Sequence, residues 1–169
     1  MRHDYKKQYK NTLVRQLEEK DLEFLRKWRN NPKNTKYLRK ISYITSDMQN
    51  DWYYSYLENE TEVMFAIDEI CELHQVVGSM ALYNIEGNQA EVGKFLIGEP
   101  KVHGLNVGSN ALRAVMAIAK DELKLKTLYL NVYKDNIPAN IVYKRAGFKI
   151  VSEHILDMGI IEYTMSIDL

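Results

Sequence analysis

A short helix with clearly marked ends limits the possible folds of this chain more than any other feature. Residues 136–148 read Asn-Ile-Pro-Ala-Asn-Ile-Val-Tyr-Lys-Arg-Ala-Gly-Phe, so a capping asparagine and a proline open the segment and a glycine closes it. Positions i, i+3 and i+7 share one helical face. Asn136, Ala139 and Tyr143 are therefore predicted to line one wall, and a strand-like run, residues 148–151, follows.

A glycine-bearing loop lies upstream and leads into an apolar helix. Residues 101–112 read Lys-Val-His-Gly-Leu-Asn-Val-Gly-Ser-Asn-Ala-Leu. Exposed N–H groups at a helix start, next to small side chains, form a cradle for phosphate groups. Taken by itself, this loop is explained equally well as the start of a buried helix. Paired with the downstream helix, it favours a pyrophosphate site.

The two segments together, in this order, resemble the GCN5-related N-acetyltransferase (GNAT) family. The resemblance is close over the second half of the chain and looser over the first. The family's loop pattern is Gln/Arg-x-x-Gly-x-Gly/Ala, and residues 103–108 depart from it at His103 and Asn106. Asparagine tolerates positive φ better than other non-glycine residues, so the turn is expected to survive. The resemblance implies acetyl-CoA as co-substrate, and the departures bear on cofactor affinity more than on fold.

The expected elements follow the order strand, helices, three antiparallel strands, helix, strand, helix and two strands. This order predicts a mixed, mostly antiparallel α/β sheet flanked by helices on both faces. It matches the acyl-CoA N-acyltransferase fold, in which the fourth and fifth strands splay apart to admit the cofactor. The ranges are 12–17, 18–30, a helix from 45, 63–67, 76–83, 90–97, 108–123, 127–133, 138–146, 148–154 and 160–168.

Residues 90–97 form a strand that carries Gly93 in its interior. Such a glycine marks a bulge or a close backbone approach; the alternative is a weak position packed against an aromatic ring. In the family, a bulge here opens the splay, and strand amides pair with the pantetheine arm of the cofactor. The resemblance assigns cofactor contacts to Phe95, Leu96, Ile97, His103, Gly104, Leu105, Asn106, Val107, Gly108, Ser109, Asn131, Asn136, Ala139, Tyr143 and Lys144.

Four of these positions have alternative roles. His103 is a phosphate-loop residue by position, but a general base or a surface histidine are the other interpretations. Asn136 contacts the cofactor, caps the helix, or does both. Asn131 bonds the pantetheine arm or a neighbouring loop. Lys144 either contacts a phosphate group of the cofactor or is a solvated positive charge, which is favourable at the C-terminal end of a helix.

Tyr143 is the candidate general acid. The thiolate of CoA leaves more readily with a proton, and a phenol with a pKa near ~10 can donate one at neutral pH. The alternative is a core tyrosine beside Phe148, one of 12 tyrosines in the chain. Glu91 is the candidate general base, acting directly or through water. The alternative is that Glu91 is an exposed strand carboxylate without a catalytic role. Many members of the family orient their reactants and need no dedicated strong base.

The acceptor is expected to bind to the first half of the chain. Trp28-Arg29-Asn30 before Pro32, together with Trp52, resembles a branch that includes aminosugar and ribosomal-protein N-terminal acetyltransferases. Trp28, Arg29, Asn30 and Trp52 are therefore the predicted substrate residues. The alternative for both tryptophans is that they are core anchors.

Local charge refines this prediction. Positive charge suits a nucleotide-linked or phosphorylated sugar, whereas a polyamine would prefer carboxylates. The basic residues concerned are Arg26, Lys27, Arg29, Lys36, Arg39 and Lys40. The preferred acceptor is the amino group of a nucleotide-linked aminosugar. The α-amino group of a ribosomal or other protein is the runner-up, and a non-catalytic acyl-CoA-binding module is the third possibility.

Composition excludes other classes of partner. Lys+Arg and Asp+Glu number 23 each, which argues against nucleic acid and acidic membranes. The single cysteine fits a reducing cytosol, no apolar run is long enough to span a bilayer, and the histidines lack metal-ligand spacing. We expect a cytoplasmic, metal-free single domain, residues 11–169, behind a polar leader, residues 1–10, that is either frayed or a strap. Exposed strand edges are compatible with a homodimer.

Overall fold

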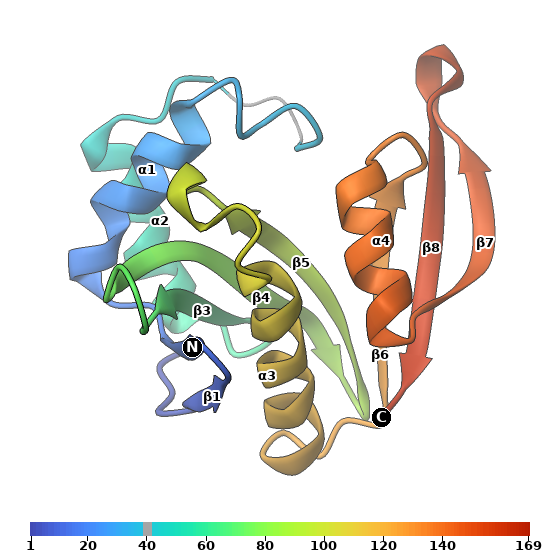
Figure 1. Ribbon diagram of the computed structural model, residues 1–169, viewed down its shortest axis with the longest axis horizontal. Coiled ribbons are helices and arrows are strands. Elements are labelled where there is room, and N and C mark those ends of the chain that lie inside the picture. The colour runs from blue at the N-terminus through green and yellow to red at the C-terminus, as the bar shows by residue number, and fades with distance from the viewer. Residues whose placement is uncertain (39–41) are drawn as a thin grey trace.

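The computed structural model describes residues 1–38 and 42–169. Its strands form one eight-stranded sheet in the order β1-β2-β3-β4-β5-β6-β8-β7. Every neighbouring pair is antiparallel except β5 and β6, which are parallel. This confirms the predicted mixed, mostly antiparallel sheet (Figure 1). The strands are β1 (Lys7–Tyr9), β2 (Thr12–Gln16), β3 (Val63–Glu69), β4 (Gln75–Glu86), β5 (Gln89–Ile97), β6 (Thr127–Tyr133), β7 (Lys149–Ile155) and β8 (Ile161–Asp168).

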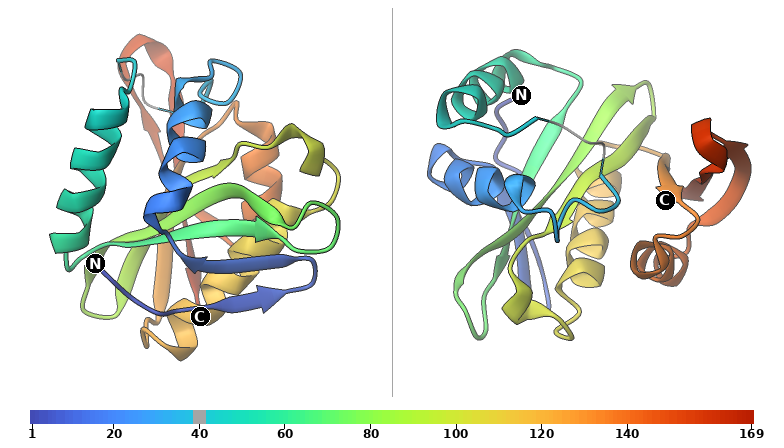
Figure 2. Two further views of the ribbon diagram at one scale, coloured as in Figure 1. Left: turned by 90° about the vertical axis from the view of Figure 1, so that its left-hand side faces the viewer. Right: turned by 90° about the horizontal axis from the view of Figure 1, so that it is seen from above.

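Helices cover both faces of the sheet. α1 (Leu22–Asn30) and α2 (Ser46–Glu58) lie on one face, and α3 (Val107–Asp121) and α4 (Ile137–Ala146) lie on the other (Figures 1 and 2). Strand β3 explains why both faces are buried: Phe65 packs in the cluster under α3, and Met64 packs in the cluster under α1 and α2. Alternate side chains of a strand point to opposite faces, so a strand covered on both sides is apolar throughout. No described helix is long and apolar enough to cross a membrane.

The polar leader is a strap rather than a frayed end. Lys7–Tyr9 pair with β2 as an edge strand. Upstream of that strand, the ring of His3 lies 3.0 Å from the carbonyl oxygen of Met64, and the Tyr56 hydroxyl donates to the carbonyl of Met1 at 2.8 Å. The first ten residues are therefore fixed across the end of the sheet.

The sheet opens into a fork between β5 and β6. These strands pair only from Gln89 opposite Thr127 to Glu91 opposite Tyr129. Beyond Glu91, β6 continues to pair with β8, while β5 stays with β4. The half of the sheet that holds β6, β8 and β7 consequently turns away from β5, as seen from above in Figure 2. This confirms the predicted splay.

A bulge interrupts β5 beside the fork. Ser79 of β4 pairs with Leu96 and Ala81 pairs with Gly93, so two residues of β5 face one residue of β4. Lys94 takes up the extra length with a φ of 48°. Both interpretations of Gly93 hold in part. The predicted bulge exists but begins at the next residue, Lys94. Gly93 also packs against an aromatic ring, because a Cβ there would lie 2.7 Å from the Tyr83 ring.

Candidate active site

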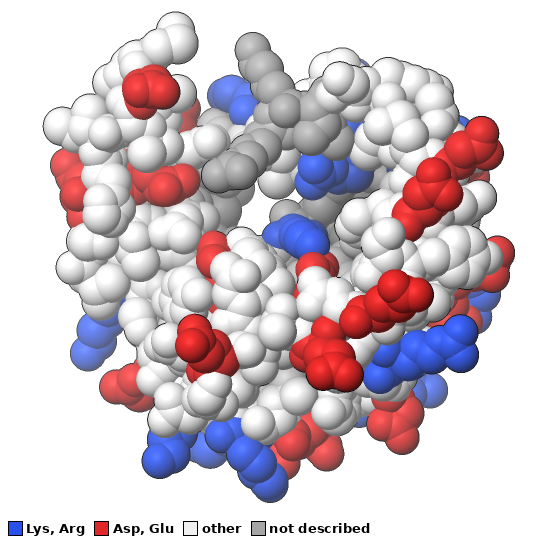
Figure 3. Space-filling model, turned by 180° about the vertical axis from the view of Figure 1, so that it is seen from behind, with Lys and Arg blue, Asp and Glu red and all other residues white. Residues whose placement is uncertain are grey.

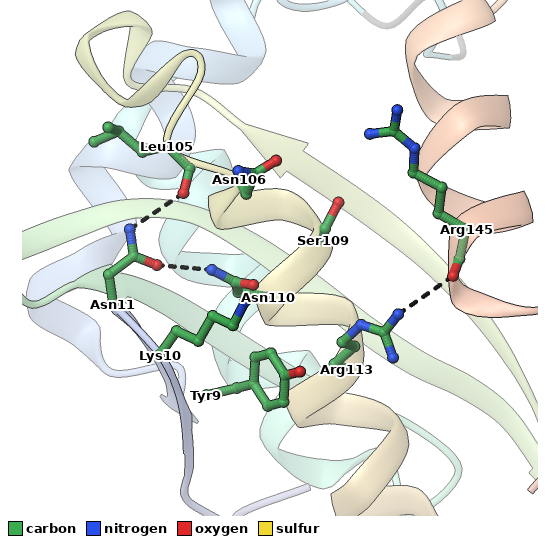
Figure 4. Close-up of a pocket in the computed structure, with 9 residues that line it drawn as sticks. All are labelled: Tyr9, Lys10, Asn11, Leu105, Asn106, Ser109, Asn110, Arg113 and Arg145. Carbon is green, nitrogen blue, oxygen red and sulfur yellow. Dashed lines mark hydrogen bonds between the residues drawn. The ribbon is translucent and has the colours of Figure 1, made fainter.

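The loop before α3 forms a cationic pocket. Asn106 caps the helix with a φ of 58°, as its tolerance of that region predicts, and Gly104 has a φ of 88°. A cavity of about 550 Å³ opens beside this helix start, and no carboxylate of the described residues lines it (Figure 4). Its walls are Tyr9, Lys10, Asn11, Leu105, Asn106, Ser109, Asn110, Arg113 and Arg145. Backbone donors at a helix start and three cations suit the phosphates of a CoA molecule.

Long-range contacts hold this pocket together. Asn110 donates to the side chain of Asn11 at 2.8 Å, and Asn11 donates to the carbonyl of Leu105 at 3.2 Å. Arg113 donates to the carbonyl of Arg145 at 3.3 Å, which joins α3 to α4 (Figure 4). The strap, the loop and both helices therefore contribute to one wall.

Tyr143 lies on the α3/α4 face of the fork. Its side chain is 7% exposed, and its ring lies 6.4 Å from that of Phe95 on β5 and 5.9 Å from that of Phe148. Burial raises the pKa of the Tyr143 hydroxyl above its ordinary value, so the phenol stays protonated. Within residues 1–38 and 42–169, the hydroxyl forms no hydrogen bond. The protonated hydroxyl is therefore a hydrogen-bond donor with no partner among the described residues, and its raised pKa makes it a weaker acid than a free phenol.

Glu91 lies on the other face, at the last paired position before the fork. Its neighbours Ala90 and Val92 pack under α3, so the Glu91 side chain points to the α2 side. Three donors hold the carboxylate: Tyr83 at 2.7 Å, Asn84 at 3.0 Å and Asn131 at 3.1 Å. The network therefore ties β4, β5 and β6 together where the sheet opens.

One further hydrogen bond supports this network. The Thr164 hydroxyl donates to Asn131 at 2.8 Å, which extends it to β8. Burial, followed by the hydrogen bond to Glu91 and its charge, raises the pKa of Tyr83. Tyr83 therefore remains a donor to the Glu91 carboxylate at neutral pH. Asn131 is predicted to bond the pantetheine arm or a neighbouring loop; in the structure its amide donates to Glu91, which lies on strand β5 and not on a loop.

The remaining predicted cofactor residues differ in position: some border the fork, some are buried or cap α4, and two are exposed. Beyond Glu91, β5 has no strand partner on its β6 side among the described residues, so the backbone of Phe95, Leu96 and Ile97 borders the fork. Gly108 lies beside this strand, because a Cβ there would contact Phe95 at 3.4 Å. Val107 is buried, Ala139 is partly buried, and the side chain of Asn136 caps α4 by accepting from the Ala139 amide at 3.4 Å. His103 and Lys144 are exposed and do not line the pocket.

The predicted substrate residues lie on α1 and α2, where Trp28 belongs to a buried cluster and Trp52 packs against it. Trp28 is 8% exposed and packs in the core under α1, which favours the alternative that it is a core anchor. Asn30 exchanges two hydrogen bonds with the backbone of Ile44, both 2.8 Å long, and so anchors the segment before α2. Arg29 is half-buried, and burial lowers the pKa of its guanidinium. Trp52 lies on α2 near β5.

The basic group on the first half of the chain is partly neutralised. Arg26 and Lys27 both form salt bridges with Glu23, at 2.7 Å and 3.5 Å. Arg39 and Lys40, which belong to the same predicted group, lie outside the described residues. The positive charge available to a substrate on α1 is therefore smaller than the sequence indicates.

The packing of Trp28 predicts a large effect of a small substitution. A Cβ on Gly98 would lie 2.1 Å from the indole of Trp28, so Gly98→Ala forces the ring or the backbone to move. We expect a loss of about 2–3 kcal/mol in the free energy of unfolding, measured by urea denaturation. Gly108→Ala is the matched control, because its Cβ makes only ordinary contacts and alanine favours the helix. Equal stability of Gly98→Ala and the wild type would refute this packing.

A forked, mostly antiparallel sheet with a cationic pocket at the start of the helix after the bulged strand is the architecture of acyl-CoA-dependent acyltransferases. Residues 11–149 match the family profile described as an acetyltransferase (GNAT) domain. The chain therefore belongs to the GNAT family of N-acetyltransferases.

Individual relatives agree with this assignment. The chain is 27% identical over 140 residues to acetyltransferase PseH of Campylobacter jejuni, covering 82% of this chain and 83% of that protein. A spermidine N-acetyltransferase from Vibrio cholerae, solved with CoA and spermine, has a similar fold: TM-score 0.83, 21% identity, 94% of this chain and 95% of that chain. A GNAT-family acetyltransferase from Bacillus anthracis has a TM-score of 0.80 at 18% identity, over 97% and 98% of the two chains.

Proposed function

We propose that the protein transfers the acetyl group of acetyl-CoA to a primary amine, and that the preferred acceptor is the amino group of a nucleotide-linked aminosugar. One observation carries the transfer chemistry. Tyr143 and Glu91 lie on opposite faces of the open fork between β5 and β6. An acid on one face and a base on the other suit a thioester that enters from the α3/α4 side and an amine that enters from the α2 side.

The proposed reaction is a direct attack in a ternary complex. The pantetheine arm lies along β5 beyond Glu91, and the phosphates of CoA are held by Lys10, Arg113 and Arg145. The amine nitrogen forms a bond to the thioester carbon, and the carbon–sulfur bond breaks. Tyr143 gives its proton to the departing sulfur, and the amine proton passes to Glu91 directly or through water.

Acceptor choice is tested with a panel of amines. Initial rates of CoA release are measured with UDP- and dTDP-linked aminosugars, with peptides that have a free N-terminus, and with spermidine. We expect the highest kcat/KM with a sugar nucleotide. Turnover of peptides alone would favour the N-terminal acetyltransferase instead. Binding of acetyl-CoA without turnover of any amine would favour a non-catalytic module.

Glu91→Gln tests the base. The amide keeps the size of the side chain but cannot accept the amine proton, so we expect kcat/KM to fall roughly 100-fold. Asn84→Gly is the control, because glycine tolerates the φ of 50° at this position, and the change removes one donor to Glu91 and leaves the carboxylate in place; its rate should stay close to that of the wild type. An unchanged rate for Glu91→Gln would mean that the reactants are only oriented, without a dedicated base.

A further inference from the structure

An aromatic and acidic enclosure lies on the α2 side of the sheet, and a lysine of the chain itself occupies it. The ammonium of Lys94 lies 5.6 Å from the centre of the Tyr83 ring and 5.9 Å from that of Trp52. The same ammonium forms a salt bridge with Glu62. The Glu62 side chain is 10% exposed and that of Lys94 is 37% exposed, so the carboxylate is buried while the cage itself is open to solvent. We call these three partners, Trp52, Tyr83 and Glu62, the ammonium cage.

Contacts outside the cage hold its two aromatic rings in place. Trp52 stacks on Tyr56 with their centres 5.8 Å apart, and Tyr83 is held by its hydrogen bond to Glu91. Aromatic faces attract cations, and they do so more strongly where water is excluded. A buried carboxylate requires a positive partner. Among the described residues, Lys94 is the one cation that forms a salt bridge with Glu62.

The β5 bulge explains how Lys94 reaches the cage. Successive residues of a regular strand point to opposite faces. Gly93 already faces the Tyr83 ring, so Lys94 would normally point toward α3. The extra residue and the positive φ of Lys94 turn its side chain to the Tyr83 side, and Phe95 then takes the place under α3. The cage therefore lies beside Glu91 and the fork. Seen from behind, the surface is hollowed near its centre, and Lys or Arg side chains lie inside the hollow (Figure 3).

We propose that Lys94 determines acceptor specificity by filling this built-in ammonium site and neutralising Glu62, which excludes polycationic amines from the acceptor cleft. The inference rests on the proposed function, in which the amine enters from the α2 side. A polyamine would have to displace the Lys94 ammonium, and its further ammonium groups would meet a like charge. An acceptor with phosphates near its amine would instead be attracted to Lys94.

Removing the lysine should open the cage to polyamines. We expect Lys94→Met to bind spermidine at least roughly tenfold more tightly than the wild type, measured by calorimetry, and to lose kcat/KM for a sugar nucleotide. Lys94→Arg keeps a cation in the cage and should still exclude spermidine. The double variant Lys94→Met/Glu62→Gln lacks the carboxylate and should lose the gain. Lys94→Gln, which can still donate to Glu62, provides the same comparison if Lys94→Met does not fold.

The outcomes separate this inference from the proposed function, because spermidine binding is read without turnover. A folded Lys94→Met or Lys94→Gln variant that binds spermidine no better than the wild type would overturn the inference. A gain that persists in the double variant would also overturn it. If the lysine variants gain spermidine binding but neither they nor the wild type acetylate any amine, the specificity inference stands and the proposed enzyme activity falls.

Discussion

Replacing Tyr143 with phenylalanine should lower kcat by roughly 100-fold or more and leave the Kd for acetyl-CoA nearly unchanged. The substitution removes only the hydroxyl. The ring would keep its packing between Phe95 and Phe148, because a phenylalanine fills the same space. The sulfur of CoA would then have to leave as an unprotonated thiolate. Rates of CoA release at saturating acetyl-CoA, together with calorimetric titration of the same protein, separate chemistry from binding.

Tyr54→Phe is the matched control for this loss. Tyr54 is 54% exposed on α2, and its hydroxyl contacts only Glu19 among the described residues, at 3.4 Å. Its removal should leave kcat close to the wild-type value. If Tyr143→Phe is as active as Tyr54→Phe, the proton reaches the sulfur from another source and Tyr143 is a core residue.

Removing Arg15 should lower the free energy of unfolding by about 3–5 kcal/mol. Its guanidinium forms paired hydrogen bonds with two carboxylates, at 2.7 and 2.9 Å to Asp21 and at 2.7 and 3.1 Å to Asp68. The hydrogen bonds that Arg15 donates to Asp21 are the largest cause that raises the pKa of Arg15. Arg15→Met leaves both acids without their cation, and Asp21 is only 2% exposed.

A triple variant identifies the cause of that loss. Arg15→Met combined with Asp21→Asn and Asp68→Asn removes the charges along with the arginine, so most of the stability should return. Urea denaturation of the three proteins gives the comparison. If Arg15→Met is as stable as the wild type, or if the triple variant remains as unstable as Arg15→Met, the buried charges are not the reason.

Local signals made the cofactor half of the fold predictable. Asn136 caps α4 and Gly147 ends it with a φ of 108°, as their residue types indicate. Asn106 stands where the family pattern has glycine, and it adopts the left-handed backbone conformation that is expected of an asparagine there. The fork, in contrast, followed from the family resemblance, because no pattern within β5 or β6 states where two strands stop pairing.

The acceptor side was less predictable because distant segments form it. Trp28 has the sequence context of a substrate residue, yet Gly98, far along the chain, places it in the core. From the sequence alone, Lys94 is an ordinary polar position in a strand. In the structure, the bulge turns its side chain toward Trp52. Lys10 lines the cationic pocket through the strap, which the sequence marks only as polar and basic. Contacts of this kind have no signature within a short window of sequence.

Transfer of a labelled acetyl group tests the central claim most directly. The protein is incubated with acetyl-CoA labelled in its acetyl group and with the panel of nucleotide-linked aminosugars, and the products are analysed by mass spectrometry. We expect the label to appear on the amino nitrogen of a sugar nucleotide and CoA thiol to be released in equal amount. If acetyl-CoA binds but no labelled product forms from any acceptor, including peptides and spermidine, acetyl transfer by this protein would be contradicted.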